Sequence, residues 1–277
     1  MYSTGRLACT LVGLLLLISG AVHTVIWWLD GSSLAGDTSW RKPMLFGFSA
    51  GVTVLSMGWL LGKLRPRWGD SLLGVLFAGA MLIEVGLITM QTWRGIPSHF
   101  NQDSPLVLAW IEGLIFFATL VIIDFTIRCF GPMSVSRDMR LAIQGGMALL
   151  LFACLFGFLM VAHGNAQLAK GAAPGRYGQA GVMKFPHGMP IHAIQYLPIL
   201  AWVGRQFEID EDTRHRGIAY ILASLVCFTL YSLMQTFGGR ARFDVTPWSA
   251  AVLVLSAGLL VIPLLTAARA HRSADPA

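Results

Sequence analysis

The sequence predicts an all-α integral membrane protein with eight transmembrane helices, built as a parallel tandem repeat of two four-helix units. Three observations predict this fold class. Of the 277 residues, 55% are hydrophobic and only 12% are charged, whereas charged residues make up about 25% of an ordinary soluble domain. Eight apolar windows are long enough to cross a bilayer, and landmarks of the first four windows recur in the last four.

A transmembrane helix needs about 20 mostly apolar residues, because each residue adds ~1.5 Å and the hydrocarbon layer is ~30 Å thick. Cutting the chain at its charged residues leaves eight such windows, taken here as spans one to eight: 7–29, 43–62, 71–93, 104–127, 141–162, 185–204, 217–239 and 245–268. Helices are the expected form, because lipid offers the backbone no hydrogen-bond partner. The first window resembles a signal peptide, but its apolar run continues through Trp27 and Trp28, so it counts as a span.

The distribution of Lys and Arg predicts the orientation. With the N-terminus inside, 8 of the 20 basic residues lie outside and the other 12 lie in the cytoplasm; the outer ones are Arg41, Lys42, Arg94, Lys170, Arg176, Lys184, Arg240 and Arg242. The positive-inside rule favours this orientation. We therefore expect a protein of the cell inner membrane with both termini in the cytoplasm. The lipid bilayer is its expected partner, and no nucleic acid is expected, because no basic run with interleaved aromatic residues is present in the sequence.

An internal duplication is indicated by landmarks that recur in the same order. The pairs are His23 and His163, Lys42 and Lys184, Gln91 and Gln235, and Pro105 and Pro247. Their separations all lie between 140 and 144 residues, as in a tandem repeat. Residues 1–136 and 137–277 are therefore predicted to be two four-helix repeats. Because each repeat has an even number of spans, the repeats are expected to be parallel and to form a site where they meet.

Histidines gather on the predicted periplasmic side. Five of the seven lie at or just under that face: His23, His99, His163, His187 and His192. Imidazole is a ligand of haem iron, copper and zinc. We expect His23, His163 and His192, with His187 close by, to bind haem or a transition metal ion.

Two acids lie inside the spans of the first repeat. Glu84 is a little past the middle of span three, and Glu112 is in the outer third of span four. A carboxylate in hydrocarbon costs ~2.5 kcal/mol or more, so both must face protein or water, stay protonated or meet a partner. We expect a catalytic role for Glu84, as a metal ligand or proton carrier, with Glu112 as its partner.

Polar residues near the ends of the spans complete the predicted site. Gln91, Gln195 and Gln235 are expected to contact the cofactor, while Arg94 and His99 form a lid over it. Gln195 follows His192 by three residues, so both project from one face of a helix. Solvated loop residues and interhelical hydrogen bonds are the plainer interpretations of the same residues.

Two functions fit this pattern. The first is a membrane redox or metal-dependent protein, an oxidoreductase in its simplest form, with a quinone or a periplasmic redox protein as partner. The alternative is a proton-coupled transporter of a small molecule, in which Glu84 and the histidines form the substrate site. The sequence lacks HExxH, CxxCH, GxGxxG and P-loop motifs. The first function is preferred because the inner half of the spans carries little polar chemistry apart from Asp124. A third interpretation is an assembly subunit without a site of its own.

Overall fold

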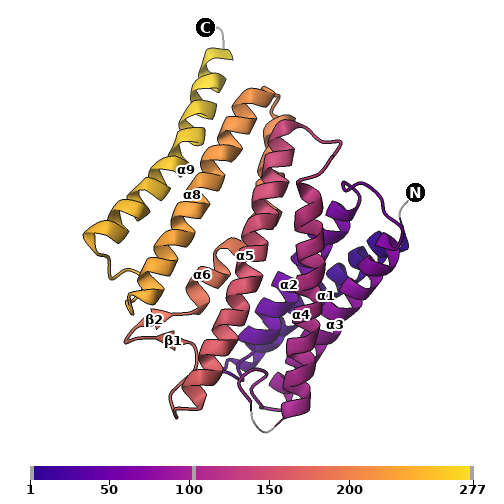
Figure 1. Ribbon diagram of the computed structural model, residues 1–277, viewed down its shortest axis with the longest axis vertical. Helices are drawn as coiled ribbons and strands as arrows, with labels where there is room; N and C mark the ends of the chain where they lie inside the picture. The colour runs from indigo at the N-terminus through magenta and orange to yellow at the C-terminus, as the bar shows by residue number, and fades with distance from the viewer. Residues whose placement is uncertain (1–2, 102–103, 275–277) are drawn as a thin grey trace. The chain divides into compact units, whose positions relative to one another are not determined.

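The computed structural model describes residues 3–101 and 104–274 and divides the chain into two compact units, Met1–Met133 and Ser134–Ala277. Both units are built from helices, with one short hairpin in the second (Figure 1). In the described part of the chain, six helices are long and apolar enough to cross a membrane. The predicted all-α, multi-pass membrane class is confirmed at this level.

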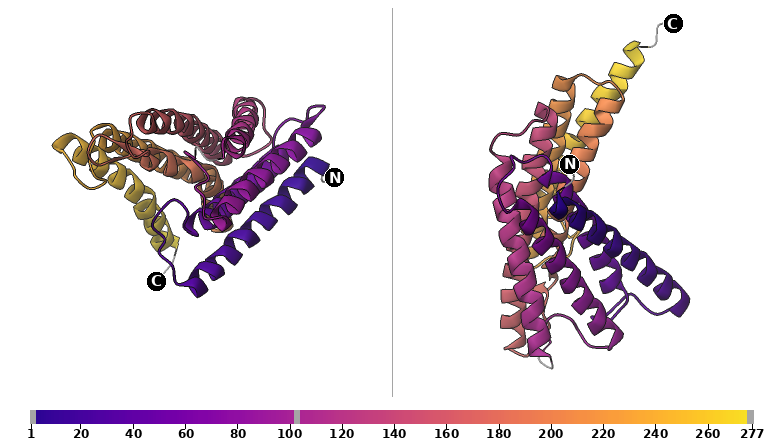
Figure 2. Two further views of the ribbon diagram at one scale, coloured as in Figure 1. Left: turned by 90° about the horizontal axis from the view of Figure 1, so that it is seen from below. Right: turned by 90° about the vertical axis from the view of Figure 1, so that its right-hand side faces the viewer.

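The first unit consists of α1 (Thr4–Asp30), α2 (Arg41–Leu61), α3 (Asp70–Trp93) and α4 (Pro105–Cys129). Helix α1 packs along α2 and α3, and α3 also packs against α2 and α4. Figure 2 shows α1 and α2 lying side by side over most of their length. This order makes α3 the helix with the most neighbours in the unit, so its middle is shielded.

Glycines set the spacing between α1 and α2. A Cβ atom on Gly47 would lie 2.7 Å from the Cα atom of Gly20, and one on Gly51 would lie 3.0 Å from the carbonyl oxygen of Gly13. In lipid, helices associate through close packing of small residues, because apolar side chains gain nothing by leaving the bilayer for each other. The backbones of α1 and α2 therefore touch where a side chain would hold them apart.

The remaining face of α1 is apolar and exposed. It carries Leu7, Leu11, Leu14, Leu15, Ile18, Val22 and Val25, each about half exposed, and ends at Trp28, which is 74% exposed. A continuous apolar surface of this length is not left open to water in a soluble protein. The surface is suited to contact with lipid tails.

The second unit contains three long helices and an irregular segment between the first two. Its elements are α5 (Arg137–Leu168), β1 (Arg176–Tyr177), β2 (Gly181–Val182), α6 (Lys184–Gly188), η1 (Pro190–His192), α7 (Ala193–Gln206), α8 (Glu211–Phe237) and α9 (Pro247–Ala274). Helix α5 packs against α7 and α8, and α8 packs against α7 and α9. The unit is thus arranged around α8, as the first is around α3.

The sixth predicted span is not one helix. The window 185–204 is divided into α6, the 3₁₀ turn η1 and α7. Pro190 lacks the N–H group that a continuous helix requires, which explains the interruption after α6, whereas Pro186 lies in the first turn of α6, where no such hydrogen bond is made. Helix α7 has 14 residues and measures roughly 21 Å, which is shorter than the ~30 Å of hydrocarbon.

The fifth predicted span is longer than its window, and a hairpin that the sequence analysis did not predict follows it. Helix α5 runs to Leu168, and β1 pairs antiparallel with β2. The Thr236 hydroxyl donates to the carbonyl oxygen of Val182 at 3.1 Å, and the Ala180 N–H donates to the Gly239 carbonyl at 2.9 Å. The hairpin is therefore fixed over the end of α8.

Candidate functional site

Helices α3 and α8 end in the same way. Gly95 and Gly239 have φ values of 67° and 66°. The N–H of Ile96 donates to the Gln91 carbonyl at 3.0 Å, and the N–H of Arg240 donates to the Gln235 carbonyl at 2.9 Å. This is the left-handed glycine termination that satisfies the last carbonyls of a helix.

The side chains of the two glutamines hold the loops that follow these helices. Gln91 and Gln235 are both buried. Arg94 donates to the Gln91 side-chain oxygen at 3.0 Å, whereas the Gln235 amide nitrogen donates to the carbonyl oxygens of Ala241 and Asp244 at 2.9 and 2.8 Å. Both glutamines thus have structural partners at the helix ends.

His23 uses both of its ring nitrogens. Its Nδ1 lies 2.7 Å from the Ser19 carbonyl oxygen, and its Nε2 lies 3.1 Å from the indole nitrogen of Trp93. An indole N–H only donates, so Nε2 accepts and Nδ1 carries the proton. His23 therefore has no ring nitrogen left for a metal ion unless one of these bonds breaks.

Two tryptophans complete the surroundings of His23. The rings of Trp40 and Trp93 meet edge to face with centroids 4.9 Å apart, and the Trp40 indole N–H donates to the Asp30 carboxylate at 3.0 Å. The Trp40 ring also lies 6.1 Å from the imidazole of His23. The cluster joins the ends of α1 and α3 to the start of α2.

A second polar cluster fixes the loop between α3 and α4. The Lys42 ammonium donates to the Ser98 hydroxyl at 3.2 Å, and that hydroxyl lies 2.9 Å from Nδ1 of His99. The imidazole of His99 stacks on Phe46, with centroids 5.9 Å apart. Arg94 and His99, the predicted lid, thus belong to a loop tied to α2 and α3.

Glu84 is a buried acid in the interior of the first unit. The residue is 3% exposed, and its Oε2 atom has no hydrogen-bond partner among the described residues. It lies 14 positions after Asp70 and 9 before Trp93, or roughly 21 and 14 Å from the two ends of α3. A carboxyl group is therefore held near the middle of a span.

Glu112, the predicted partner of Glu84, lies in α4 and is half-buried. Within residues 3–101 and 104–274, no hydrogen bond or ion pair joins its carboxylate to that of Glu84. Their predicted partnership stays a prediction.

The second unit holds the other three predicted ligands. Nε2 of His163 donates to the Arg176 carbonyl oxygen at 2.7 Å, and Nδ1 of His187 donates to the Ala153 carbonyl oxygen at 2.8 Å. In the neutral form of each imidazole, the second ring nitrogen is then an acceptor. His192 lies 3.3 Å from the side-chain oxygen of Gln195, so this predicted pair is close in space.

No group of three or more His, Cys, Asp or Glu side chains that could hold a metal ion occurs in the part of the chain that the structure describes. His23 lies in the first unit, and His163, His187 and His192 lie in the second.

The sequence analysis missed the partners that fix the predicted residues. Ser98 and Trp40 were not singled out, although they contact His99, Lys42 and His23. The contact between Lys42 and Ser98 spans 56 residues, and no spacing rule within one helix predicts such a contact. The one available signal was the position of both residues beside the ends of predicted spans.

Comparison of the chain with protein-family models, with curated proteins and with solved structures gives no match. The functional argument therefore rests on the residues described above.

Proposed function

We propose that this chain is a proton-coupled transporter of a small molecule in the cell inner membrane, with both termini in the cytoplasm and Glu84 as the proton carrier. The observation that carries the proposal is the burial of Glu84 in mid-helix, with Oε2 unpartnered among the described residues. An ionised carboxylate without a partner is costly there, so the group favours a bound proton. Release of that proton requires a change of surroundings, which is the coupling step of such a carrier.

The packing order of the two units supports a duplicated architecture. Helices α5, α7, α8 and α9 neighbour one another in the same pattern as α1, α2, α3 and α4. Their third helices also share the glycine termination at Gly95 and Gly239. We propose eight spans as a parallel tandem repeat, with α6, η1 and α7 together as the sixth. Parallel repeats are one of the arrangements on which transporters are built.

The two units differ at the position of the acid. Phe228 lies 144 residues after Glu84, the same separation as between Gln91 and Gln235. Its ring packs against Phe185 and Tyr231, with centroids 5.9 and 5.7 Å apart. The proposed proton site is therefore single and belongs to the first unit.

Transport by reconstituted protein tests the proposal. Proteoliposomes with an imposed pH gradient and an entrapped pH-sensitive dye are supplied with mixtures of amino acids, sugars, carboxylic acids and organic cations. For the active mixture, we expect wild-type protein to dissipate the gradient and Glu84→Gln to fall to the rate of empty vesicles. Glu208→Gln is the control, since the same change is made in an exposed acid to which no role is assigned.

Infrared difference spectroscopy gives a readout that needs no substrate. Wild-type protein should show the C=O band of a protonated carboxyl group that Glu84→Gln lacks and Glu208→Gln retains. Identical spectra for wild-type and Glu84→Gln, with equal proton flux, would refute the proposal.

A membrane oxidoreductase with haem or a transition metal ion is the second candidate, and His187 favours it. A ligand histidine is commonly oriented by donating its other ring N–H to a carbonyl oxygen, and Nδ1 of His187 does so to Ala153. His187, with His192 and His163, would supply the ligands, and a quinone or a periplasmic redox protein would be the partner.

The absorption spectrum and metal content of the purified protein distinguish the two candidates. A Soret band or a bound metal that is lost in His187→Ala, and retained in His23→Ala, would support the oxidoreductase. A colourless protein without metal would count against the oxidoreductase and favour the transporter.

A further inference from the structure

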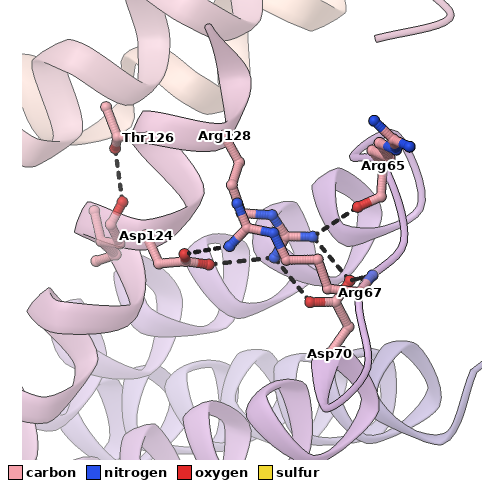
Figure 3. A network of polar contacts seen from close by, with 7 residues as sticks. Arg65, Arg67, Asp70, Asp124, Thr126 and Arg128 are labelled. Atoms are coloured by element: carbon pink, nitrogen blue, oxygen red, sulfur yellow. Dashed lines mark hydrogen bonds and ion pairs between the residues drawn. The ribbon is translucent and has the colours of Figure 1, made fainter. Parts of the chain in front are cut away.

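An ion network closes the end of the first unit at which α2 and α4 end and α3 begins (Figure 3). The guanidinium of Arg128 donates to both carboxylate oxygens of Asp70 at 2.8 Å, to Asp124 at 3.2 Å and to the Arg65 carbonyl at 3.0 Å. Arg67 donates to the other oxygen of Asp124 at 3.0 Å. Both carboxylates are therefore already neutralised by arginines of the network.

A cavity of about 440 Å³ opens beside this network. Its lining consists of Arg65, Pro66, Arg67, Ile127, Arg128, Gly131 and Pro132. The three arginines outnumber the two carboxylates of the network, so the site carries excess positive charge. The guanidinium of Arg65 is exposed and makes no hydrogen bond to any described residue. Its planar donor fork is thus available to an anion.

Exposed apolar residues lie in this lining or directly beside it in the sequence. Ile127 lines the cavity and is 66% exposed, while Trp68 and Phe130, which adjoin the lining residues Arg67 and Gly131, are fully exposed and 63% exposed. These three residues are called the rim below. Tryptophan is enriched where a membrane meets water, because its ring is amphipathic. A positively charged pocket beside exposed apolar side chains matches a molecule with an anionic head and an apolar tail.

We propose that this pocket binds the phosphate group of an anionic phospholipid. Arginine forks match phosphate oxygens bidentately, and such bonds between charged groups are stronger than neutral ones. Basic pockets at the cytoplasmic ends of transmembrane helices suit phospholipid head groups, and in the orientation proposed above this end of the first unit is cytoplasmic. Inorganic phosphate would use the same guanidinium groups, but it would gain nothing from the apolar rim. Glu84 does not line this pocket, and lipid binding there does not depend on the proposed transport function.

Tryptophan quenching by brominated lipids measures this binding. Full-length protein in dodecyl maltoside micelles is titrated with phosphatidylglycerol or phosphatidylcholine that carries brominated acyl chains, and subtraction of the Trp68→Phe signal isolates quenching at the rim. We expect half of the Trp68 fluorescence to be quenched at a lower mole fraction of phosphatidylglycerol than of phosphatidylcholine. Arg65→Gln should raise that fraction about fivefold, as expected for one arginine near a lipid surface. Arg65→Lys should restore part of the difference, because it returns the charge without the fork.

Lys63→Gln is the matched control, because it removes one positive charge two residues away from the pocket lining. The Lys63 ammonium lies over the ring of Trp59, with 5.7 Å to the centroid. We expect its half-quenching fraction to equal that of wild type, and circular dichroism checks that each variant folds. Equal effects of Arg65→Gln and Lys63→Gln, or equal affinity for the two lipids, would overturn the proposal. Protection of the protein against unfolding by inorganic phosphate, without preference for phosphatidylglycerol, would assign the pocket to free phosphate instead.

Discussion

The two units pack their helices in the same order but place their polar groups differently. In the first unit, α3 carries Glu84 in its middle, whereas α8 carries Phe228, which follows Glu84 by the same 144 residues that separate Gln91 from Gln235. His23 has both nitrogens bonded, whereas His187 donates from Nδ1 alone. Packing of this kind depends on small residues and helix ends, so it tolerates large changes in the side chains between them. Function is therefore best sought where the units differ.

The units also differ in which helices their buried ion pairs join. Arg128 and Asp70 join α4 to α3, while Arg214 and Asp138 join α8 to α5 at 2.7 Å. We expect the largest effect from Asp138→Ala, because the Asp138 side chain is fully buried and the Arg214 side chain 10% exposed. An unpaired buried charge costs about 3–5 kcal/mol. Chemical unfolding of the purified protein in detergent measures the loss.

The adjacent residue provides the control for this prediction. Arg137 pairs with Asp212, and both side chains are about two-thirds exposed. Arg137→Ala should cost no more than about 1 kcal/mol, as for other surface pairs. Similar losses in Asp138→Ala and Arg137→Ala would show that the second unit does not depend on its buried pair.

The second largest loss of stability is expected from substitution of closely packed glycines, which tests whether close helix packing stabilises both units. A Cβ on Gly47 would lie 2.7 Å from Gly20, and one on Gly146 would lie 2.6 Å from the Cα of Ile194. Gly47→Ala and Gly146→Ala should each destabilise the protein by about 1–3 kcal/mol, because the backbones must separate. The measurement is the midpoint of thermal unfolding in detergent.

A Gly→Ala substitution at a position without close neighbours should stabilise the protein. A Cβ on Gly79 would meet no described atom within 4 Å, so Gly79→Ala should stabilise α3 by about 0.4–1 kcal/mol through the unfolded state. If Gly47→Ala and Gly79→Ala shift the midpoint in the same direction, close packing does not determine the spacing of α1 and α2.

The sequence was sufficient for the membrane class and for the ends of several helices. Apolar length predicts spans such as α3, and a proline after a small polar residue predicts the starts of α4 and α9. The interrupted segment after Lys184 was predicted as one helix, because hydropathy does not register the N–H group that Pro190 lacks. The hairpin at Tyr177 was not predicted, because strands of two residues are too short to show an alternation of apolar and polar residues.

The candidate site was less accessible to sequence reasoning. The depth of Glu84 and His23 in the membrane could be predicted from their positions in the spans, because each residue of a helix adds a fixed rise. The bonds that occupy His23 come from Trp93, which lies 70 residues away, and such contacts depend on how helices pack. Polar residue types therefore indicated where chemistry is possible, whereas their partners decide which of them remains available.

A smaller effect is expected from the indole that bonds His23. Trp93→Phe keeps the ring but removes the donor to Nε2, and the loss of one such hydrogen bond costs about 0.5–1.5 kcal/mol. Trp28→Phe is the control, since Trp28 is exposed and its ring has no contact with His23 among the described residues. Equal unfolding midpoints for these two variants would indicate that His23 is held by Ser19 alone and that its Nε2 is open to other ligands.

The smallest effect concerns the starts of the two central helices. Helix α8 is capped by Asp210, whose carboxylate accepts from the Thr213 N–H at 2.9 Å, whereas Gly69 before α3 provides no side-chain cap. The hydrogen bonds from Thr213 lower the pKa of Asp210 below its usual value of 3.8. Such a lowered pKa stabilises the folded protein at pH values above the pKa of Asp210 in the unfolded chain. This stabilisation is lost as the pH falls through the pKa of Asp210 in the folded protein.

Asp210→Ala should therefore destabilise the protein at pH 7, and the difference in stability from wild type should shrink below about pH 4. Asp210→Asn retains an acceptor without the charge, so its stability relative to Asp210→Ala should not change with pH. If the difference between wild type and Asp210→Ala does not depend on pH, the side chain stabilises α8 through its hydrogen bond and not through its charge. The start of α8 would then differ from that of α3 in having a side-chain hydrogen bond, and its negative charge would not matter.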